Sequence, residues 1–95
     1  MSEIHFTGYF RERMRLRSVP EAAVRKILTE STERYFDLET VRFVALGRAR
    51  FGRKGARLLM VAYEQQGNIL TAVTVHDVTR LQVRAHIKSG RWIEE

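Results

Sequence analysis

The first thirty residues place apolar side chains at helical spacing after a short extended start. Glu3–Phe6 has the length and alternation of an edge strand. Thr7 is suited to cap a helix running from Gly8 to about Arg17, because its hydroxyl can accept a hydrogen bond from a first-turn N–H. Phe10 and Met14 mark the side of this helix that should be buried.

A second helix is predicted to follow at once. Ser18 and Glu21 have the spacing of a capping box, and Pro20 fits the first turn, where its missing N–H costs nothing. The helix should fade near Ser31. Its apolar stripe comprises Val19, Ala23, Val24, Ile27 and Leu28.

Beyond this helix the period of the pattern changes to two. Arg34–Leu38 could form a strand, and Val41–Phe51 alternates over a longer one. Ala56–Gln65 is nearly continuously apolar in its middle, which predicts a central strand covered on both faces. A hairpin turn then leads into a strand over Ile69–Val75.

The C-terminal part reads as one more helix and a short tail. Asp77 or Thr79 should cap a helix over about Arg80–Lys88, and Ser89-Gly90 should end it. Trp92 is expected to pack the tail onto the body. The order β-α-α-β-β-β-α predicts a single α+β domain over residues 1–95, a two-layer sandwich with an antiparallel sheet.

Composition narrows the class of protein. The chain is 44% hydrophobic and 29% charged, as expected of a globular domain. It has no cysteine, so disulfides and thiolate chemistry are excluded. The longest apolar run, Leu58–Tyr63, is far too short to span a membrane. The acidic start shows no signal peptide, and we expect a cytoplasmic protein.

Charge points to a class of partner. The net charge is +6, and fourteen of the seventeen cationic residues are arginine. Guanidinium groups pair with phosphate through two hydrogen bonds and stack on bases. This balance favours RNA, DNA or an acidic protein as the partner, and the alternative is a solubilising surface with no specific target.

The N-terminal segment resembles a family of small uncharacterised bacterial domains. That family opens with a strand, a Thr or Ser cap, a His, an Arg-Met pair, an Arg three residues later and an apolar residue two further on. The matching residues here are Thr7, Arg13, Met14, Arg17 and Val19. The family's His would fall at Tyr9, where this chain departs. The stretches Ala72–His76 and Ser89–Trp92 also resemble some members.

The family in turn resembles RelE-type ribonuclease toxins in the order of its elements. That resemblance implies a compact sheet with two helices on one face and a concave, basic other face that accepts RNA. It also implies RNA cleavage without a metal or other cofactor, and an acidic antitoxin-like protein as a partner.

Metal-independent RNA cleavage needs a base, an acid and cations that stabilise the charged transition state. His76 is the leading candidate for proton transfer, since it ends a predicted strand next to Asp77. Alternation places it on the same side as Leu70, Ala72 and Thr74. The alternative is a structural histidine bonded to a cap or to the backbone.

The first helix supplies the other catalytic candidates. Tyr9 could act as acid or base in place of the family's His, or stack on a base; packing in the core is the alternative. Arg13 and Arg17 are four residues apart and share a helix face, so they could clamp phosphate and hold transition-state charge. They could equally bridge to Asp37 or Glu39.

The densest basic cluster predicts nucleic-acid contacts. The cluster comprises Arg48, Arg50, Arg53, Lys54 and Arg57. Arg48 and Arg50 lie on one side of a strand, and Arg53 and Lys54 lie in the turn beside Phe51. Basic side chains beside an aromatic ring suit phosphate and base contacts. Solvated turn residues, or charges that prevent edge pairing, are the alternatives.

His86 is expected on a solvated helix face.

Two hypotheses follow from the sequence. The first is a RelE-like, RNA-interacting protein that could be a metal-independent endoribonuclease toxin. The second is a non-catalytic interaction module for nucleic acid or an acidic protein, which could form a homodimer through an exposed sheet edge. The sequence contains no His, Cys, Asp or Glu cluster with the spacing of metal ligands, and no glycine-rich phosphate-binding loop.

Overall fold

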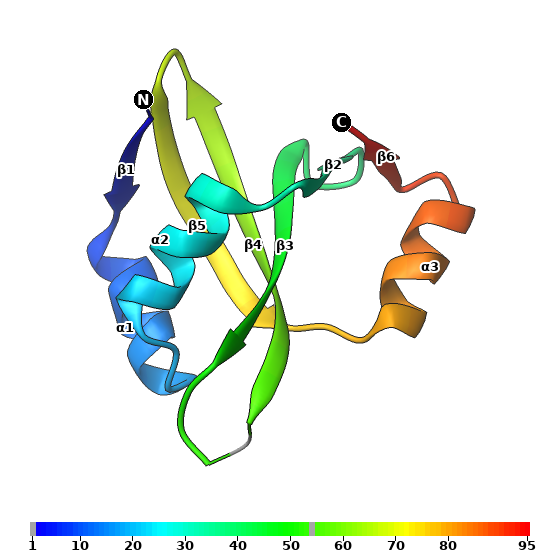
Figure 1. Cartoon of the computed structure of the whole chain (residues 1–95). Helices are drawn as coiled ribbons and strands as arrows, with labels where there is room; N and C mark the ends of the chain where they lie inside the picture. The colour runs from blue at the N-terminus through cyan, green and yellow to red at the C-terminus, as the bar shows by residue number, and fades with distance from the viewer. Residues whose placement is uncertain (1, 54) are drawn as a thin grey trace.

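A single sheet runs through the molecule, with helices on both of its sides (Figure 1). The structure is a computed structural model that describes residues 2–53 and 55–95. Its elements are β1 (Glu3–Phe6), α1 (Gly8–Leu16), α2 (Glu21–Glu30), β2 (Glu33–Asp37), β3 (Arg42–Arg50), β4 (Ala56–Gln66), β5 (Ile69–Asp77), α3 (Arg80–Lys88) and β6 (Trp92–Glu94). None of the described helices is long and apolar enough to cross a membrane.

The strand order across the sheet is β1-β5-β4-β3-β2-β6. β1 runs parallel to β5, and all other neighbours are antiparallel. The predicted α+β sandwich is confirmed, with a sheet that is antiparallel except at β1. The structure has two more strands than the predicted element order. β2 forms a full strand against β3, and the C-terminal tail pairs with β2 as β6. Three residues are too few for alternation to reveal β6 in the sequence.

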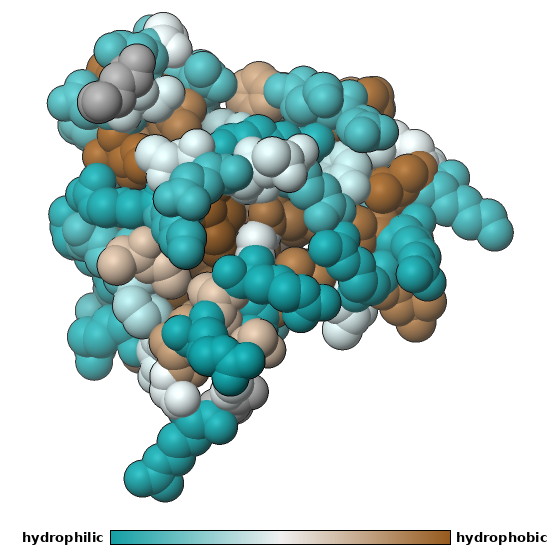
Figure 2. Space-filling view, in the orientation of Figure 1, coloured by the Kyte–Doolittle hydropathy of each residue, from teal (hydrophilic) through white to brown (hydrophobic). Residues whose placement is uncertain are grey.

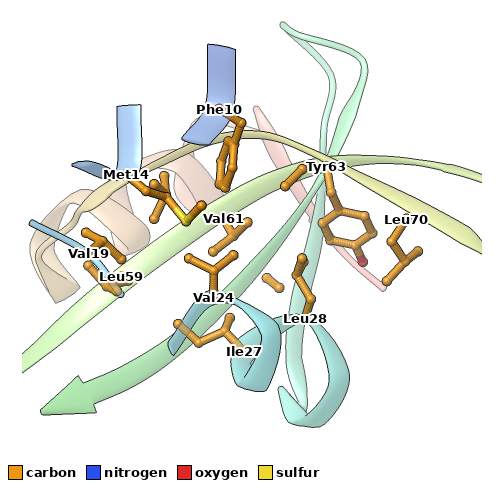
Figure 3. Close-up of a cluster of buried hydrophobic side chains, with 13 residues drawn as sticks. Phe10, Met14, Val19, Val24, Ile27, Leu28, Leu59, Val61, Tyr63 and Leu70 are labelled. Carbon is orange, nitrogen blue, oxygen red and sulfur yellow. The ribbon is translucent and has the colours of Figure 1, made fainter. Parts of the chain in front are cut away.

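One face of the sheet, called the first face below, is covered by α1 and α2. Their apolar stripes meet side chains from β4 and β5 in one buried cluster, as Figure 3 shows. Its buried members are Phe10, Met14, Val19, Val24, Ile27, Leu28, Ala45, Leu59, Val61, Tyr63, Leu70, Ala72 and Val75. Both predicted helix stripes and the doubly covered central strand are therefore confirmed.

The opposite, second face carries its own core beneath α3. Its buried members are Tyr35, Val44, Leu46, Leu58, Met60, Ala62, Val78, Val83 and Trp92. Arg80 of α3 donates two hydrogen bonds to Glu33, at 2.7 and 2.9 Å, and so ties the helix to β2. The resemblance implied an open second face, and α3 covers part of it instead.

Two of the three predicted helix caps are confirmed. The hydroxyl of Thr7 accepts from the N–H of Phe10 at 3.0 Å, and Thr79 forms a full capping box with Gln82. The predicted capping box at Ser18 is wrong, because α2 begins at Glu21 with no side-chain cap. Ser18 adopts a left-handed conformation (φ 53°) and closes the end of α1 instead.

α2 lies unusually close to β3 at Gly47. A Cβ atom on Gly47 would stand 2.7 Å from Cγ1 of Ile27. The absence of a side chain at this position therefore lets the helix rest on the strand.

The substitution Gly47→Ala should destabilise the fold by about 1–2 kcal/mol, because Ile27 must move out of a packed position. Urea unfolding measures this directly. In an Ile27→Ala background the same substitution should cost much less, since the opposing atom is gone. Gly8→Ala serves as the control, because a Cβ there meets nothing within 4 Å. An equal cost in both backgrounds would contradict the close approach.

Candidate nucleic-acid interface

Three segments that are distant in sequence meet in one groove, toward the lower end of the sheet in Figure 1. They are the end of α1, the β3–β4 turn and the end of β5. The lining residues are Leu16, Arg17, Ser18, Phe51, Gly52, Arg53, Arg57, His76 and Asp77. The groove has a volume of about 740 Å³ and is called the basic groove below.

Arg17 stands where α1 ends and is held against β5. Its Nη1 donates a hydrogen bond of 2.6 Å to the carbonyl oxygen of Val75. The predicted alternative of an ion pair with Asp37 or Glu39 is wrong, because Arg91 occupies both carboxylates. A guanidinium has five N–H donors, so most of those of Arg17 remain for another partner.

Arg57 forms the wall of the groove. Its Nε and Nη2 donate to the two carboxylate oxygens of Asp77, both at 2.9 Å. Its guanidinium carbon lies 4.5 Å from the ring centre of Phe51. This contact and the paired hydrogen bonds fix the turn to β5, so Arg57 acts chiefly by building the site.

The ring of His76 is oriented by the backbone. Its Nδ1 lies 2.9 Å from the carbonyl oxygen of Asp77. Because a carbonyl can only accept, a hydrogen bond here is donated by Nδ1, and in the tautomer that has this hydrogen Nε2 is free to accept. The structural interpretation of His76 is confirmed, since one ring nitrogen contacts the backbone. The exposed ring also lines the groove, and its role in proton transfer stays a prediction.

The side of the sheet on which His76 lies differs from the prediction. Ala72 belongs to the first-face core, but His76 pairs with Met60 of the second-face core. The register of β4 and β5 shifts between Ala62 and Tyr63, which is a β-bulge. One extra residue in a strand reverses the alternation beyond it, and the sequence pattern does not reveal where this occurs.

The predicted basic cluster is divided by the structure. Arg53 lines the basic groove from the β3–β4 turn. Arg48 and Arg50 are exposed on β3 and line a different groove, beside α2. Lys54 lies outside the described residues. Among the described residues of the cluster, Arg53 and Arg57 therefore line the groove with Arg17 and His76, and Arg48 and Arg50 do not.

Tyr9 and Arg13 lie further back along α1. Tyr9 is 65% exposed, so the alternative of core packing is wrong. The guanidinium of Arg13 lies 5.2 Å from the centre of the Tyr9 ring. Tyr9 precedes Arg17 by eight residues, which is about 12 Å of helix. The pair extends the surface beyond the groove and does not bring a phenol to His76.

His76 also lines a smaller cavity of about 300 Å³ beneath α3. His86 lines this cavity too, and its ring centre lies 4.7 Å from that of Trp92. The prediction that His86 is solvated is therefore wrong, since it is half-buried against the tail.

The basic groove is suited to bind an anion. Three guanidinium groups and one carboxylate line it, which leaves it positive. Among residues 2–53 and 55–95, no group of three or more His, Cys, Asp or Glu could hold a metal ion. His76 is the one imidazole among the described lining residues, and the carboxylate of Asp77, which also lines the groove, accepts two hydrogen bonds from Arg57. Cleavage needs both a base and an acid, and no second group on the described lining stands ready beside His76 for that role.

No protein-family model, curated protein or solved structure matches the chain. The functional assignment therefore depends on the geometry and charge of the groove.

Proposed function

We propose that the protein binds single-stranded RNA, with backbone phosphates held in the basic groove. The observation that carries the proposal is the convergence of Arg17, Arg53 and His76 from three separate segments. The choice of RNA follows from the resemblance to RelE-type proteins. A flexible single strand also suits an open groove with one aromatic residue in its wall.

Each residue has a distinct part in this proposal. Arg17 is positioned in advance by its bond to Val75, so little freedom is lost when it binds phosphate. Arg53 is exposed on the turn and contacts the next phosphate. The exposed Tyr9 ring, with Arg13 against it, offers a surface on which a base can stack farther along α1.

Cleavage is an extension of the same proposal. Nε2 of His76 would take the proton of a 2′-hydroxyl, and Arg17 would stabilise the charged phosphate. A second group must then protonate the leaving oxygen, and Tyr9 is too far along the helix to do so without movement. Binding is therefore the function that the geometry supports best.

We expect Arg53→Ala to weaken RNA binding by about tenfold, because one charge-assisted contact to phosphate is lost. Fluorescence anisotropy with a labelled single-stranded RNA measures the affinity over a range of salt concentrations. For the two phosphates held by Arg17 and Arg53, the logarithm of the affinity should fall with the logarithm of salt with a slope of about −1.4. Removing Arg53 should make that slope shallower by about 0.7.

The matched control is Arg84→Ala, an exposed arginine on α3 that does not line the basic groove. Equal effects of the two substitutions would show that charge alone, and not the groove, attracts RNA. Incubation of the RNA with wild type and His76→Ala in EDTA tests cleavage. Salt-insensitive or absent binding would favour the rival hypothesis of a module for an acidic protein.

A further inference from the structure

β3 is paired on both edges over only half its length. β2 covers Arg42–Leu46. Residues 47–50 continue to pair with β4 on the other side, but among the described strands none covers their outer edge. In Figure 1, β2 lies beside the upper part of β3 and the lower part runs free. This stretch is called the open edge below.

The backbone groups at the open edge belong to Arg48 and Arg50. The hydroxyl of Ser31 donates to the carbonyl oxygen of Leu46, which therefore points toward the outer edge. Successive residues of a strand direct their N–H and C=O groups alternately to its two sides. Arg48 and Arg50 therefore direct theirs outward like Leu46, and a strand placed here would find two donors and two acceptors.

A groove accompanies the open edge. It lies between α2 and β3, has a volume of about 570 Å³, and is mostly apolar in character. Ala23 and Ile27 line it from the helix, Ala49 lines it from the strand, and Phe51 lines it from the turn that follows. Figure 2 shows apolar surface in the middle of this view, bordered by hydrophilic side chains. Small apolar side chains of an added strand would fit this groove.

Charge distinguishes between the possible occupants. The side chains of Arg48 and Arg50 project on the second face, and Lys26 borders the groove. Within the described part of the chain, Arg48 and Arg50 form no ion pair. Antiparallel pairing of two open edges would set these arginines opposite one another, which is unfavourable. A second copy is therefore disfavoured and an acidic strand favoured.

We propose that the open edge binds an extended acidic segment of a partner protein, which joins the sheet as a further strand beside β3. In the partner's strand, the residues opposite Arg48 and Arg50 are acidic and project on the same face as the two guanidinium groups. The residues between them face the groove beside α2 and are small and apolar. The recognised pattern is thus an alternation of acidic and apolar residues. This site adjoins the basic groove at Phe51 but shares none of its cationic residues, and it does not depend on RNA binding.

The first test uses a synthetic heptapeptide of alternating Glu and Val, with a Gln-and-Val peptide as the uncharged control. Amide hydrogen exchange, followed by NMR, reports each backbone N–H of the wild-type protein. At a peptide concentration ten times Kd, exchange at Arg48 and Arg50 should slow by about tenfold. Gly47 and Ala49 already face β4 and should change little. The Gln peptide should bind more weakly.

Two variants separate the charge from the backbone donor. Arg48→Ala removes only the charge. Arg48→Pro removes the charge and the outward N–H, and keeps the pairing of β3 with β4 because that N–H faces away from β4. The proline variant should bind the Glu peptide about three- to tenfold more weakly than the alanine variant. Arg50→Ala and Arg50→Pro, at the end of the strand, provide a second pair if Arg48→Pro does not fold.

Three outcomes would overturn the proposal. Binding of the Glu peptide without slower exchange at Arg48 and Arg50 would show a general electrostatic contact. Slower exchange at these amides on raising the protein concentration alone would identify a second copy as the occupant. Slower exchange with single-stranded RNA but not with the peptide would identify RNA. Loss of RNA binding in Arg53→Ala does not bear on the first two outcomes, because Arg53 lines the basic groove and not the groove beside α2.

Discussion

Replacing Asp37 by asparagine should destabilise the fold by about 3 kcal/mol at neutral pH, because it removes the negative charge and turns one of two acceptor oxygens in a buried network into a donor. Asp37 is only 3% exposed. It accepts from Nε and Nη2 of Arg91, both at 3.1 Å, and from the indole N–H of Trp92 at 3.2 Å. Backbone N–H groups of Glu39 and Thr40 also donate to it. An amide would leave several of these donors without an acceptor.

The same carboxylate makes stability depend on pH. Burial alone would raise the pKa of Asp37, but the hydrogen bonds from Arg91, the backbone and Trp92 outweigh it and lower that pKa to about 2. Because the folded pKa lies below the unfolded value of 3.8, the carboxylate stabilises the fold above about pH 4. That contribution, about 2 kcal/mol, is lost as the pH falls through about 4 to 2.

Urea unfolding of wild type and Asp37→Asn over this range measures both effects. The difference between the two proteins should be largest near neutral pH and should shrink in acid. Glu39→Gln is the matched control, because Glu39 lies 3.5 Å from the same guanidinium but is exposed. Its cost should stay within about 0.5 kcal/mol. A difference that stays constant down to about pH 2 would show that the ionised carboxylate is not the stabilising form.

The helices and strands could be predicted from the sequence because local periodicity reports them. The stripes of α1 and α2 and the apolar middle of β4 each follow from the face that is buried. The failures are at positions decided by distant contacts. Ser18 takes a left-handed turn that brings α2 back over the sheet, and its capping pattern does not reveal this. β6 exists because the network of Asp37 ties down the tail.

The candidate site could be predicted by residue type but not by arrangement. The sequence predicts a phosphate contact for Arg53 and catalytic roles for Arg17 and His76. The structure brings the three residues to one groove, and their roles stay predictions. The pairing of Arg57 with Asp77 joins residues twenty apart and depends on the register of β4 and β5. The local sequence pattern of either strand does not predict how the two strands are aligned. Tyr9 stays apart because helical spacing fixes its distance from the end of α1.

The substitution Phe10→Ala should have the largest effect on stability, about 4 kcal/mol. Phe10 is completely buried and stacks on Phe6 with ring centres 5.3 Å apart. Together with Met14 it supplies the buried contacts of α1. Removing the ring would leave a cavity that the strands of the sheet cannot close. A domain of this size has a net stability of about 5–15 kcal/mol, so much of the margin would be lost.

Urea unfolding checks the size of this effect against two controls. Phe10→Leu retains most of the buried volume and should cost clearly less. Leu16→Ala changes an exposed side chain at the other end of α1 and should stay within about 0.5 kcal/mol. Similar costs for Phe10→Ala and Leu16→Ala would contradict the packing of α1 onto the sheet.

The same variant tests how the groove is positioned, because α1 ends at Arg17. RNA affinity is measured at a temperature where Phe10→Ala is still folded. If packing of α1 places Arg17, the affinity should fall by nearly as much as in Arg17→Ala. If the hydrogen bond from Arg17 to Val75 is sufficient by itself, stability should fall and affinity should not. The first result would make the hydrophobic contacts of the first face a requirement for binding, and the second would assign that role to a single hydrogen bond.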